Sequence, residues 1–336
     1  MLNTNTRYLD ETVISYAKDL TKYLPNELKT CFFTNSGSES NDLALRLART
    51  ATGSKETIVL DGAYHGHVSS LIDISPYKHN SKGGSGPPNY VHTLPIPDSY
   101  RGKYRGEEAH SGYIDELKKI IFSIKKNGKK ISAFVVESLM GCGGQLILPK
   151  GFLKSAFDLV REEGGVCIAD EVQIGFGRVG SHFWGFETAN VQPDIVTMGK
   201  SMGNGHPLSV VVANKQITDK FNNGMEYFNS FGGNPVSCAV GKAVLSVIEE
   251  EKLQQNAHKV GKYLLKKLKN LQDEFSLIGQ VRGMGLFIGV ELINEGSKLI
   301  PARKEAEKVV NGMMRKRILL STDCLLYTSP SPRDRG

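Results

Sequence analysis

Short runs of β-branched and aromatic residues alternate with longer helix-like stretches over most of this chain. The short runs predict strands at residues 57–61, 131–137, 166–169, 195–198 and 208–212. Apolar residues at helical spacing predict helices at 39–49, 113–126, 150–163, 236–251, 257–271 and 302–316. Strands separated by helices usually form a mainly parallel sheet with helices on both faces, because each crossover lies against one face. The sequence therefore predicts an α/β fold, in which a ligand binds beyond the carboxyl ends of the strands.

The chain is long enough to hold more than one unit. It has 336 residues, of which 40% are hydrophobic, and chains of this length usually divide into domains. We expect a large domain over residues 1–258. A smaller α/β domain should cover 259–323, with a strand at 286–292 and another beginning in 318–323. The last residues, 324–336, break the pattern, and we expect them to be a non-native tail outside the fold.

Composition and charge disfavour several classes of function. The formal net charge is +7, which suits nucleic acid or a small anionic substrate, but the charges are spread out, so we expect no nucleic-acid partner. No apolar run is long enough to cross a bilayer, so no membrane partner is expected. Five cysteines without a CxxC pair fit neither a disulfide framework nor a zinc site. We expect Cys31, Cys167 and Cys238 to be buried, unreactive thiols.

The segment 35-NSGSESNDLALRLART-50 places small polar residues directly before an amphipathic helix. Ser36 and Glu39 have the spacing of a capping box, which satisfies free N–H groups at a helix start. The same turn could instead bind phosphate, because the free N–H groups and the helix dipole both favour an anion. Taken alone, the segment fits either interpretation.

Two predicted strands end in residues that can take part in catalysis. One strand runs into Asp170 and Glu171, and another runs into Lys200, at the start of a glycine-rich loop. Pyridoxal phosphate needs such a set: a lysine for its aldehyde, a carboxylate for its ring nitrogen and a helix N-terminus for its phosphate. We therefore expect Gly37 and Ser38 to bind the phosphate through their N–H groups.

The chain resembles the class III aminotransferases, which are pyridoxal-phosphate enzymes of fold-type I. The motifs occur in family order and are 35-NSGSESN-41, 64-YHGH-67, 170-DEVQIGFGRVG-180, 199-GKSMGNGHPL-208 and 231-FGGNP-235. The resemblance implies that Lys200 is the Schiff-base lysine and that Asp170 pairs with the ring nitrogen. It places Gln173 near the ring hydroxyl and Tyr64 against the ring. Ser230 stands where relatives carry a threonine that reaches the phosphate from the neighbouring subunit, which implies a homodimer with shared active sites.

Further segments narrow the resemblance to an animal subgroup that includes ethanolamine-phosphate phospho-lyase and 5-phosphohydroxy-lysine phospho-lyase. These segments are 61-DGAYHGHVSSLIDISPYK-78, 98-DSYRGKYR-105 and 221-FNNGMEYFNSFGGNPVSCAVG-241. In 137-ESLMGCGG-144, Cys142 replaces a glutamate that pairs with an arginine in the transaminases. A thiol cannot form that ion pair, so we expect a lyase acting on a phosphorylated amine, with ethanolamine phosphate first. A transaminase that uses glyoxylate or pyruvate is the alternative.

The resemblance also bears on metal binding, completeness and localisation. His65 and His67 could suggest a metal, but the YHGH motif explains them without a third ligand, and we expect no metal. Family chains extend further at both ends, so we expect this chain to be a fragment that is itself inactive. Relatives occur in mitochondria, and the localisation, mitochondrial or cytoplasmic, stays open.

Overall fold

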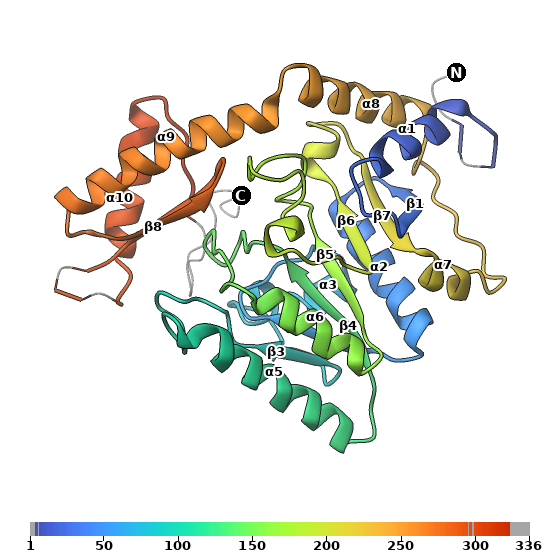
Figure 1. The fold of residues 1–336 in the computed structure, drawn as a ribbon, viewed down its shortest axis with the longest axis horizontal. Helices are drawn as coiled ribbons and strands as arrows, with labels where there is room; N and C mark the ends of the chain where they lie inside the picture. The colour runs from blue at the N-terminus through green and yellow to red at the C-terminus, as the bar shows by residue number, and fades with distance from the viewer. Residues whose placement is uncertain (1–3, 6, 295, 298, 323–336) are drawn as a thin grey trace.

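The computed structural model describes residues 4–5, 7–294, 296–297 and 299–322. A seven-stranded sheet with helices packed against it forms the larger part, and a two-stranded hairpin with two long helices extends from one side (Figure 1). The strands of the large sheet are β1 (Leu28–Thr34), β2 (Glu56–Leu60), β3 (Val91–Leu94), β4 (Ile131–Glu137), β5 (Val166–Asp170), β6 (Ile195–Met198) and β7 (Ser209–Asn214). The helices around it are α1 (Glu11–Thr21), α2 (Gly37–Thr52), α3 (Ser69–Asp73), α4 (Pro76–His79), α5 (Glu108–Lys126), α6 (Phe152–Glu162), α7 (Lys215–Phe221) and α8 (Pro235–Glu250).

The large sheet has the strand order β1-β7-β6-β5-β4-β2-β3. Strand β7 is antiparallel to both of its neighbours, and the remaining pairs are parallel. The mainly parallel α/β fold predicted from the sequence is therefore confirmed. Because the parallel strands end at one edge, β4 and β5 place Glu137 and Asp170 side by side there.

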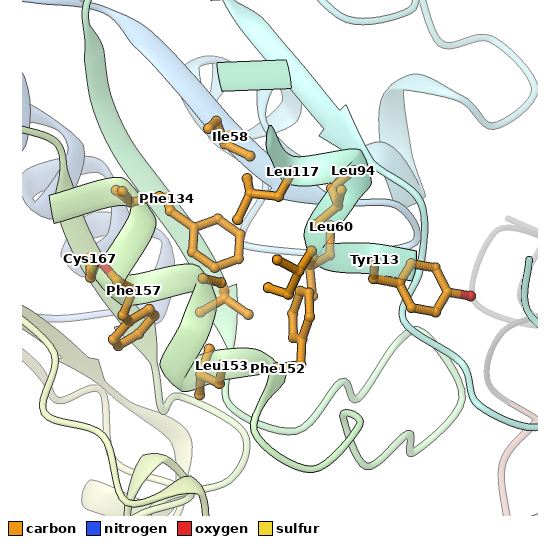
Figure 2. Packing of buried hydrophobic residues seen from close by; sticks show 14 of the residues in the cluster. Ile58, Leu60, Leu94, Tyr113, Leu117, Phe134, Phe152, Leu153, Phe157 and Cys167 are labelled. Atoms are coloured by element: carbon orange, nitrogen blue, oxygen red, sulfur yellow. The ribbon is translucent and has the colours of Figure 1, made fainter. Parts of the chain in front are cut away.

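Both faces of the sheet are buried along β2, β4, β5 and β6, and this explains why these strands are continuous apolar runs. Alternate residues of one strand face opposite sides: Ile58 and Leu60 of β2 join one cluster, whereas Val59 joins another. The first cluster packs against α5 and α6, which supply Leu117 and Phe157 among others (Figure 2). Helix α2 covers the second cluster with its apolar stripe. The edge that holds the strand ends is thus supported from both sides.

The smaller part consists of α9 (Leu253–Glu274), β8 (Ile278–Met284), β9 (Phe287–Leu292) and α10 (Arg303–Arg315). Strands β8 and β9 form an antiparallel hairpin that packs on α9. The expected domain boundary after residue 258 falls inside α9. The division of the chain into a large and a small domain remains a prediction. The expected tail, 324–336, lies outside the described residues.

The strand expected to begin in 318–323 is wrong for residues 318–322, which form no strand. The chain turns there instead, because Arg317 adopts a positive φ of 62° and Ile318 donates its N–H to the carbonyl of Met313. Such bonds cap the carbonyl end of α10 and draw the backbone away from an extended course. A strand also needs a neighbouring strand for its backbone groups.

Two of the three cysteines that were expected to be buried are buried. Cys167 and Cys238 are buried, and burial raises the pKa of Cys238 to about 12. Full burial was the wrong expectation for Cys31, which is half-buried, although desolvation also raises its pKa to about 12. Thiols with such pKa values react slowly. Among the described residues, none of the helices is both long and apolar enough to span a bilayer.

Candidate active site

The start of α2 is capped without using all of its N–H groups. Ser36 is the N-cap, and its Oγ accepts the N–H of Glu39 at 3.2 Å. The Glu39 carboxylate reaches back to the N–H of Asn35 at 3.2 Å, one residue earlier than a standard capping box. In the described part of the chain, the N–H groups of Gly37 and Ser38 donate to no other residue. The cap and an anion site are therefore compatible at this helix start.

Close packing brings the Lys200 turn against the start of α2. A Cβ on Gly37 would lie 2.7 Å from Cγ1 of Val172, so only glycine fits there. A Cβ on Gly199 would lie 3.4 Å from the Gly37 nitrogen. The residue before Lys200 and the first turn of α2 are thus neighbours, with the Val172 side chain touching both. Val172 was not among the predicted site residues, although it lies only two positions after Asp170.

Lys200 begins a short 3-10 turn, η2 (Lys200–Met202), directly after β6. Its φ of 40° lies in the left-handed region, which is unusual for a residue with a side chain. Such a conformation costs about 1–3 kcal/mol and is typical of functional sites, where the surroundings impose it. The side chain of Lys200 is exposed, and it forms no hydrogen bond within the described residues.

Asp170 ends β5 and is held by three donors. Its Oδ2 accepts Nδ2 of Asn41 and lies 2.8 Å from Nδ1 of His65, and its Oδ1 accepts the N–H of Val172 at 3.1 Å. Asn41 is fixed in turn by the hydroxyl of Thr197 at 2.6 Å. Three donors stabilise a carboxylate and fix its direction. Asp170 is therefore suited to hold a cation beyond the strand ends.

His65 is a residue whose role the sequence analysis missed. Its ring is buried against the Asp170 carboxylate, which explains the histidine without a metal. Across the described ranges, no three histidine, cysteine or acidic side chains are grouped as a metal site. The contact between His65 and Asp170 joins two segments far apart in sequence, and spacing alone does not show such a contact.

Glu171, the second acid of the strand end, has a structural role. Its carboxylate accepts the Ser138 hydroxyl at 2.5 Å and the N–H groups of Gly185 and Phe186 at 2.8 and 2.9 Å. Burial raises its pKa to about 7. These bonds use both oxygens to hold loops together, so Asp170 alone of the two acids is placed to act on a ligand.

Glu137, at the end of β4, is a further residue that the sequence analysis did not single out. Its two oxygens accept the N–H of Tyr64 at 3.2 Å and the N–H of Gly141 at 2.8 Å. Desolvation of the buried carboxyl raises its pKa to about 7. Glu137 therefore joins the Tyr64 segment to the loop that carries Cys142.

Tyr64 and Gln173 both lie close to the segment that Glu137 holds. The Tyr64 ring is half-buried and meets Tyr77 edge-on, with ring centroids 5.9 Å apart. Burial raises the pKa of Tyr64, and the nearby Cys142 thiol and Asp170 carboxylate raise it further. Gln173 is exposed, and its Cγ lies 3.3 Å from the place of a Cβ on Gly141. The predicted residues Tyr64, Asp170 and Gln173 are thus grouped at one edge of the sheet.

Ser230 lies in an exposed segment that is tied to the same helix start. The neighbouring Asn229 donates to Glu39 at 2.9 Å and accepts from Asn35 at 3.0 Å. These bonds place the Ser230 segment beside the first turn of α2. The expected action of Ser230 on a second subunit stays a prediction, since the structure contains one chain.

The site fits pyridoxal phosphate. The uncommitted N–H groups of Gly37 and Ser38 suit its phosphate, the carboxylate of Asp170 suits its ring nitrogen, and the amine of Lys200 suits its aldehyde. The packing at Gly37 supports the fit, because a side chain there would collide with Val172.

Known proteins share this chain's sequence and fold. The family profile described as aminotransferase class-III matches residues 2–320. A Drosophila melanogaster protein named alanine–glyoxylate aminotransferase 2-like is 50% identical over 329 residues, which cover 96% of this chain and 67% of the relative. An ethanolamine-phosphate phospho-lyase homolog from Caenorhabditis elegans is 39% identical over 95% of this chain and 71% of its own length. The human mitochondrial alanine–glyoxylate aminotransferase 2 is 41% identical over 90% of this chain and 62% of its own length.

Solved structures agree with the sequence relatives. A phospholyase from Arthrobacter in complex with phosphoethanolamine superposes with a TM-score of 0.89 at 38% identity, over 99% of this chain and 77% of that one. An amine transaminase from an uncultivated Pseudomonas species, bound to pyridoxal phosphate, gives 0.87 at 26% identity, over 96% and 77%. The sheet is therefore that of fold-type I, and pyridoxal phosphate is the cofactor. The chain belongs to the class III aminotransferase family.

Proposed function

We propose that the full-length protein is a phospho-lyase that eliminates phosphate and ammonia from a phosphorylated amine, with ethanolamine phosphate first and 5-phosphohydroxy-lysine second. The observation that carries this proposal is Cys142, whose thiol lies near Tyr64 where transaminases of the family carry a glutamate. A cysteine side chain cannot bind an arginine through two oxygens as a carboxylate does. The likeness to a phospholyase in complex with phosphoethanolamine supports the same substrate class.

The residues of the site have distinct roles in this reaction. Pyridoxal phosphate, when bound, accepts the electrons released at the substrate carbon next to the amine. Lys200 would hold the cofactor aldehyde, and its amine, when free, would act as the base that takes the proton from this carbon. Asp170, fixed by His65 and Asn41, keeps the ring nitrogen protonated. The N–H groups at the start of α2 bind the phosphate of the cofactor.

Elimination requires a leaving group on the carbon next to the one that loses its proton. The phosphate leaves with the bonding electron pair, and a double bond forms between the two carbons. The resulting enamine takes up water and releases an aldehyde and ammonia. The reaction therefore yields one phosphate and one ammonia for each amine and needs no acceptor molecule.

The alternative function is transamination to glyoxylate or pyruvate. The Drosophila relative, which is 50% identical to this chain, is named alanine–glyoxylate aminotransferase 2-like, and this name favours transamination. A transaminase must hold an amine and then a keto acid in one site, which the family achieves with the glutamate that Cys142 replaces. This difference makes the alternative the second candidate.

The decisive experiment supplies each phosphorylated amine to the full-length protein without a keto acid. We expect phosphate, ammonia and aldehyde in equal amounts, and a Lys200→Ala preparation serves as the blank. The proposal fails if nothing is released, while glyoxylate or pyruvate starts amino transfer from an unphosphorylated amine.

Assembly and localisation remain part of the proposal. We expect a homodimer in which Ser230 of one subunit binds the cofactor phosphate of the other. Mixing a Ser230→Ala variant with a Lys200→Ala variant should form hybrid dimers with one intact site, and activity should return. Both mitochondrial and cytoplasmic localisation stay open, and fluorescence microscopy of the tagged full-length protein decides between them.

A further inference from the structure

The loop of residues 141–145, between β4 and α6, forms a closed turn. A pair of backbone bonds between Met140 and Leu146, at 3.1 and 3.0 Å, closes its neck. Within it, the N–H groups of Gly144 and Gln145 donate to the carbonyl of Gly141 at 2.9 and 3.2 Å. Gln145 has a positive φ of 50°, which is strained for a residue with a side chain. We refer to residues 141–145 as the Cys142 loop, which these backbone bonds close into one turn.

The Cys142 loop is held on one side by the large sheet. The Glu137 carboxylate accepts the N–H of Gly141 at 2.8 Å and the N–H of Tyr64 at 3.2 Å. The loop and the Tyr64 segment are therefore fixed to the same strand end. This contact sets where the loop begins but leaves its far end, at Gly144, to other partners.

The β8–β9 hairpin holds the far end of the Cys142 loop. Arg282 of β8 donates to the carbonyl of Gly144 from Nε at 3.1 Å and from Nη2 at 2.7 Å. Its side chain is only 11% exposed. The hairpin also touches the loop directly, since a Cβ on Gly289 would lie 3.0 Å from Cβ of Gln145. A fork of two donors on one carbonyl fixes direction as well as distance.

The Arg282 guanidinium is itself held in place. Glu291 of β9 accepts its Nη2 at 2.8 Å, and Gln280 accepts its Nη1 at 2.9 Å. The second oxygen of Glu291 pairs with Nε of Arg101 at 3.3 Å. Arg101 belongs to the large part of the molecule, so Glu291 links this part to the hairpin. The side chains of Glu291 and Arg282 are nearly buried, which makes a rearrangement of this group costly.

We propose that Arg282 is a positioning residue that fixes the Cys142 loop from the hairpin and so sets where Cys142 stands beside Tyr64. The smaller part of the molecule then shapes the wall of the substrate site without touching the substrate. The link to substrate choice rests on the proposed function, whereas the placement of the loop does not.

The test measures how fast a maleimide labels Cys142 in the full-length protein, by peptide mapping. Arg282→Lys keeps the charge but loses the fork, and the loss of a hydrogen bond from a charged group should open the loop more often. We expect about tenfold faster labelling of Cys142. The thiols of Cys167 and Cys238 report on general unfolding, and their labelling should not change.

Arg161→Lys is a matched control. Like Arg282, Arg161 binds both a carboxylate and a backbone carbonyl, but its two-nitrogen fork is on the carboxylate of Asp194 and a single nitrogen donates to the carbonyl of Gln192. Arg161 and Asp194 lie at the amino ends of the strands, away from the carboxyl ends that carry the candidate site, because Asp194 directly precedes β6. In Arg161→Lys, the maleimide should label Cys142 at the same rate as in the unaltered protein. If Arg282→Lys unfolds, the shape-conserving variant Glu291→Gln replaces it, with the same expectation.

The kinetic constants of Arg282→Lys distinguish a displaced Cys142 loop from a general loss of structure. We expect Arg282→Lys to raise KM for the phosphorylated amine by about tenfold with a smaller change in kcat, because a displaced wall weakens binding. Unchanged labelling of Cys142 in both Arg282→Lys and Glu291→Gln would overturn the inference, whatever happens to activity. If Cys142 is labelled faster in Arg282→Lys and the unaltered protein has no lyase activity, the inference about Arg282 is supported and the proposed function is refuted.

Discussion

Glu137 and Asp170 are in-register neighbours at the ends of β4 and β5, yet their surroundings give the two carboxyl groups different properties. Asp170 accepts two side-chain donors and one backbone N–H. Glu137 accepts two backbone N–H groups, and its burial raises its pKa to about 7. One sheet edge thus places a carboxyl group whose direction is fixed by three donors next to a carboxyl group that holds two loops together.

The Asp170→Asn variant should retain the cofactor but lose most activity. An amide cannot keep the ring nitrogen protonated, and the loss of a key electrostatic partner lowers kcat by about 10²–10³-fold or more. Rates with the preferred substrate and the visible absorbance of bound cofactor measure the two effects. Asp158→Asn, which alters an exposed pair with Lys154, should leave both unchanged. Near-normal turnover in Asp170→Asn would remove this residue from the mechanism.

Lys200→Ala should abolish covalent attachment of the cofactor together with activity. The strained φ of 40° at this position indicates that the fold holds the lysine in one place. Borohydride reduction followed by peptide mapping identifies the attachment point. Lys215→Ala, which removes an exposed partner of Asp219, is the control and should still be modified at Lys200. Modification of another lysine in Lys200→Ala would show that the assignment is wrong.

Within the large sheet, most of the strands that the sequence predicted have two buried faces. Strands β2, β4, β5 and β6 are continuous apolar runs because helices cover both sides of them. Strand β1 was missed, since its segment contains the exposed residues Lys29 and Thr30 at the edge of the sheet. The reversed direction of β7 was also missed, because an apolar run carries no signal of its orientation.

The candidate site was predictable wherever a motif carries the chemistry. Lys200, Asp170 and the start of α2 were proposed in this way. The role of His65 was missed because its partner, Asp170, comes from a distant strand. Glu137 was missed for a related reason: its function lies in bonds to the backbone of Tyr64 and Gly141. Backbone groups are present in every residue and leave no trace in a sequence.

Gly37→Ala should weaken cofactor binding with little loss of secondary structure. The added methyl would stand 2.7 Å from the buried Val172 side chain and would displace the start of α2. We expect the Kd for pyridoxal phosphate to rise at least about tenfold, as a loss of about 1.4 kcal/mol implies. Absorbance titration of the protein measures it.

Gly312→Ala is the control for Gly37→Ala. Gly312 lies within α10, and its added methyl would meet no other atom within 4 Å. Alanine is favoured over glycine inside a helix, by about 0.8–1.0 kcal/mol. This variant should therefore be slightly more stable and should bind the cofactor normally. Equal Kd values for both variants would show that the start of α2 does not bind the phosphate.

Glu137→Gln should change how stability depends on pH. The folded pKa of Glu137, about 7, lies above its ordinary value of 4.5, so the folded state binds its proton more tightly. This contribution to stability is complete below pH 4.5 and is lost as the pH rises through 7. The variant carries no such proton. Relative to Glu137→Gln, the unaltered protein should therefore lose about 3 kcal/mol of unfolding free energy between pH 4.5 and 8.

Denaturant titrations of both proteins at several pH values measure this difference. Glu171, whose pKa is also raised to about 7, is present in both proteins and cancels. Glu116→Gln provides the control: hydrogen bonds from Lys119, Tyr104 and Lys103 lower the pKa of Glu116 to about 2. The stability contributed by Glu116 is present above its unfolded pKa, so this variant should differ from the unaltered protein by a constant amount from pH 5.5 to 8. A constant difference for Glu137→Gln as well would mean that Glu137 ionises in the folded protein as it does in the unfolded chain.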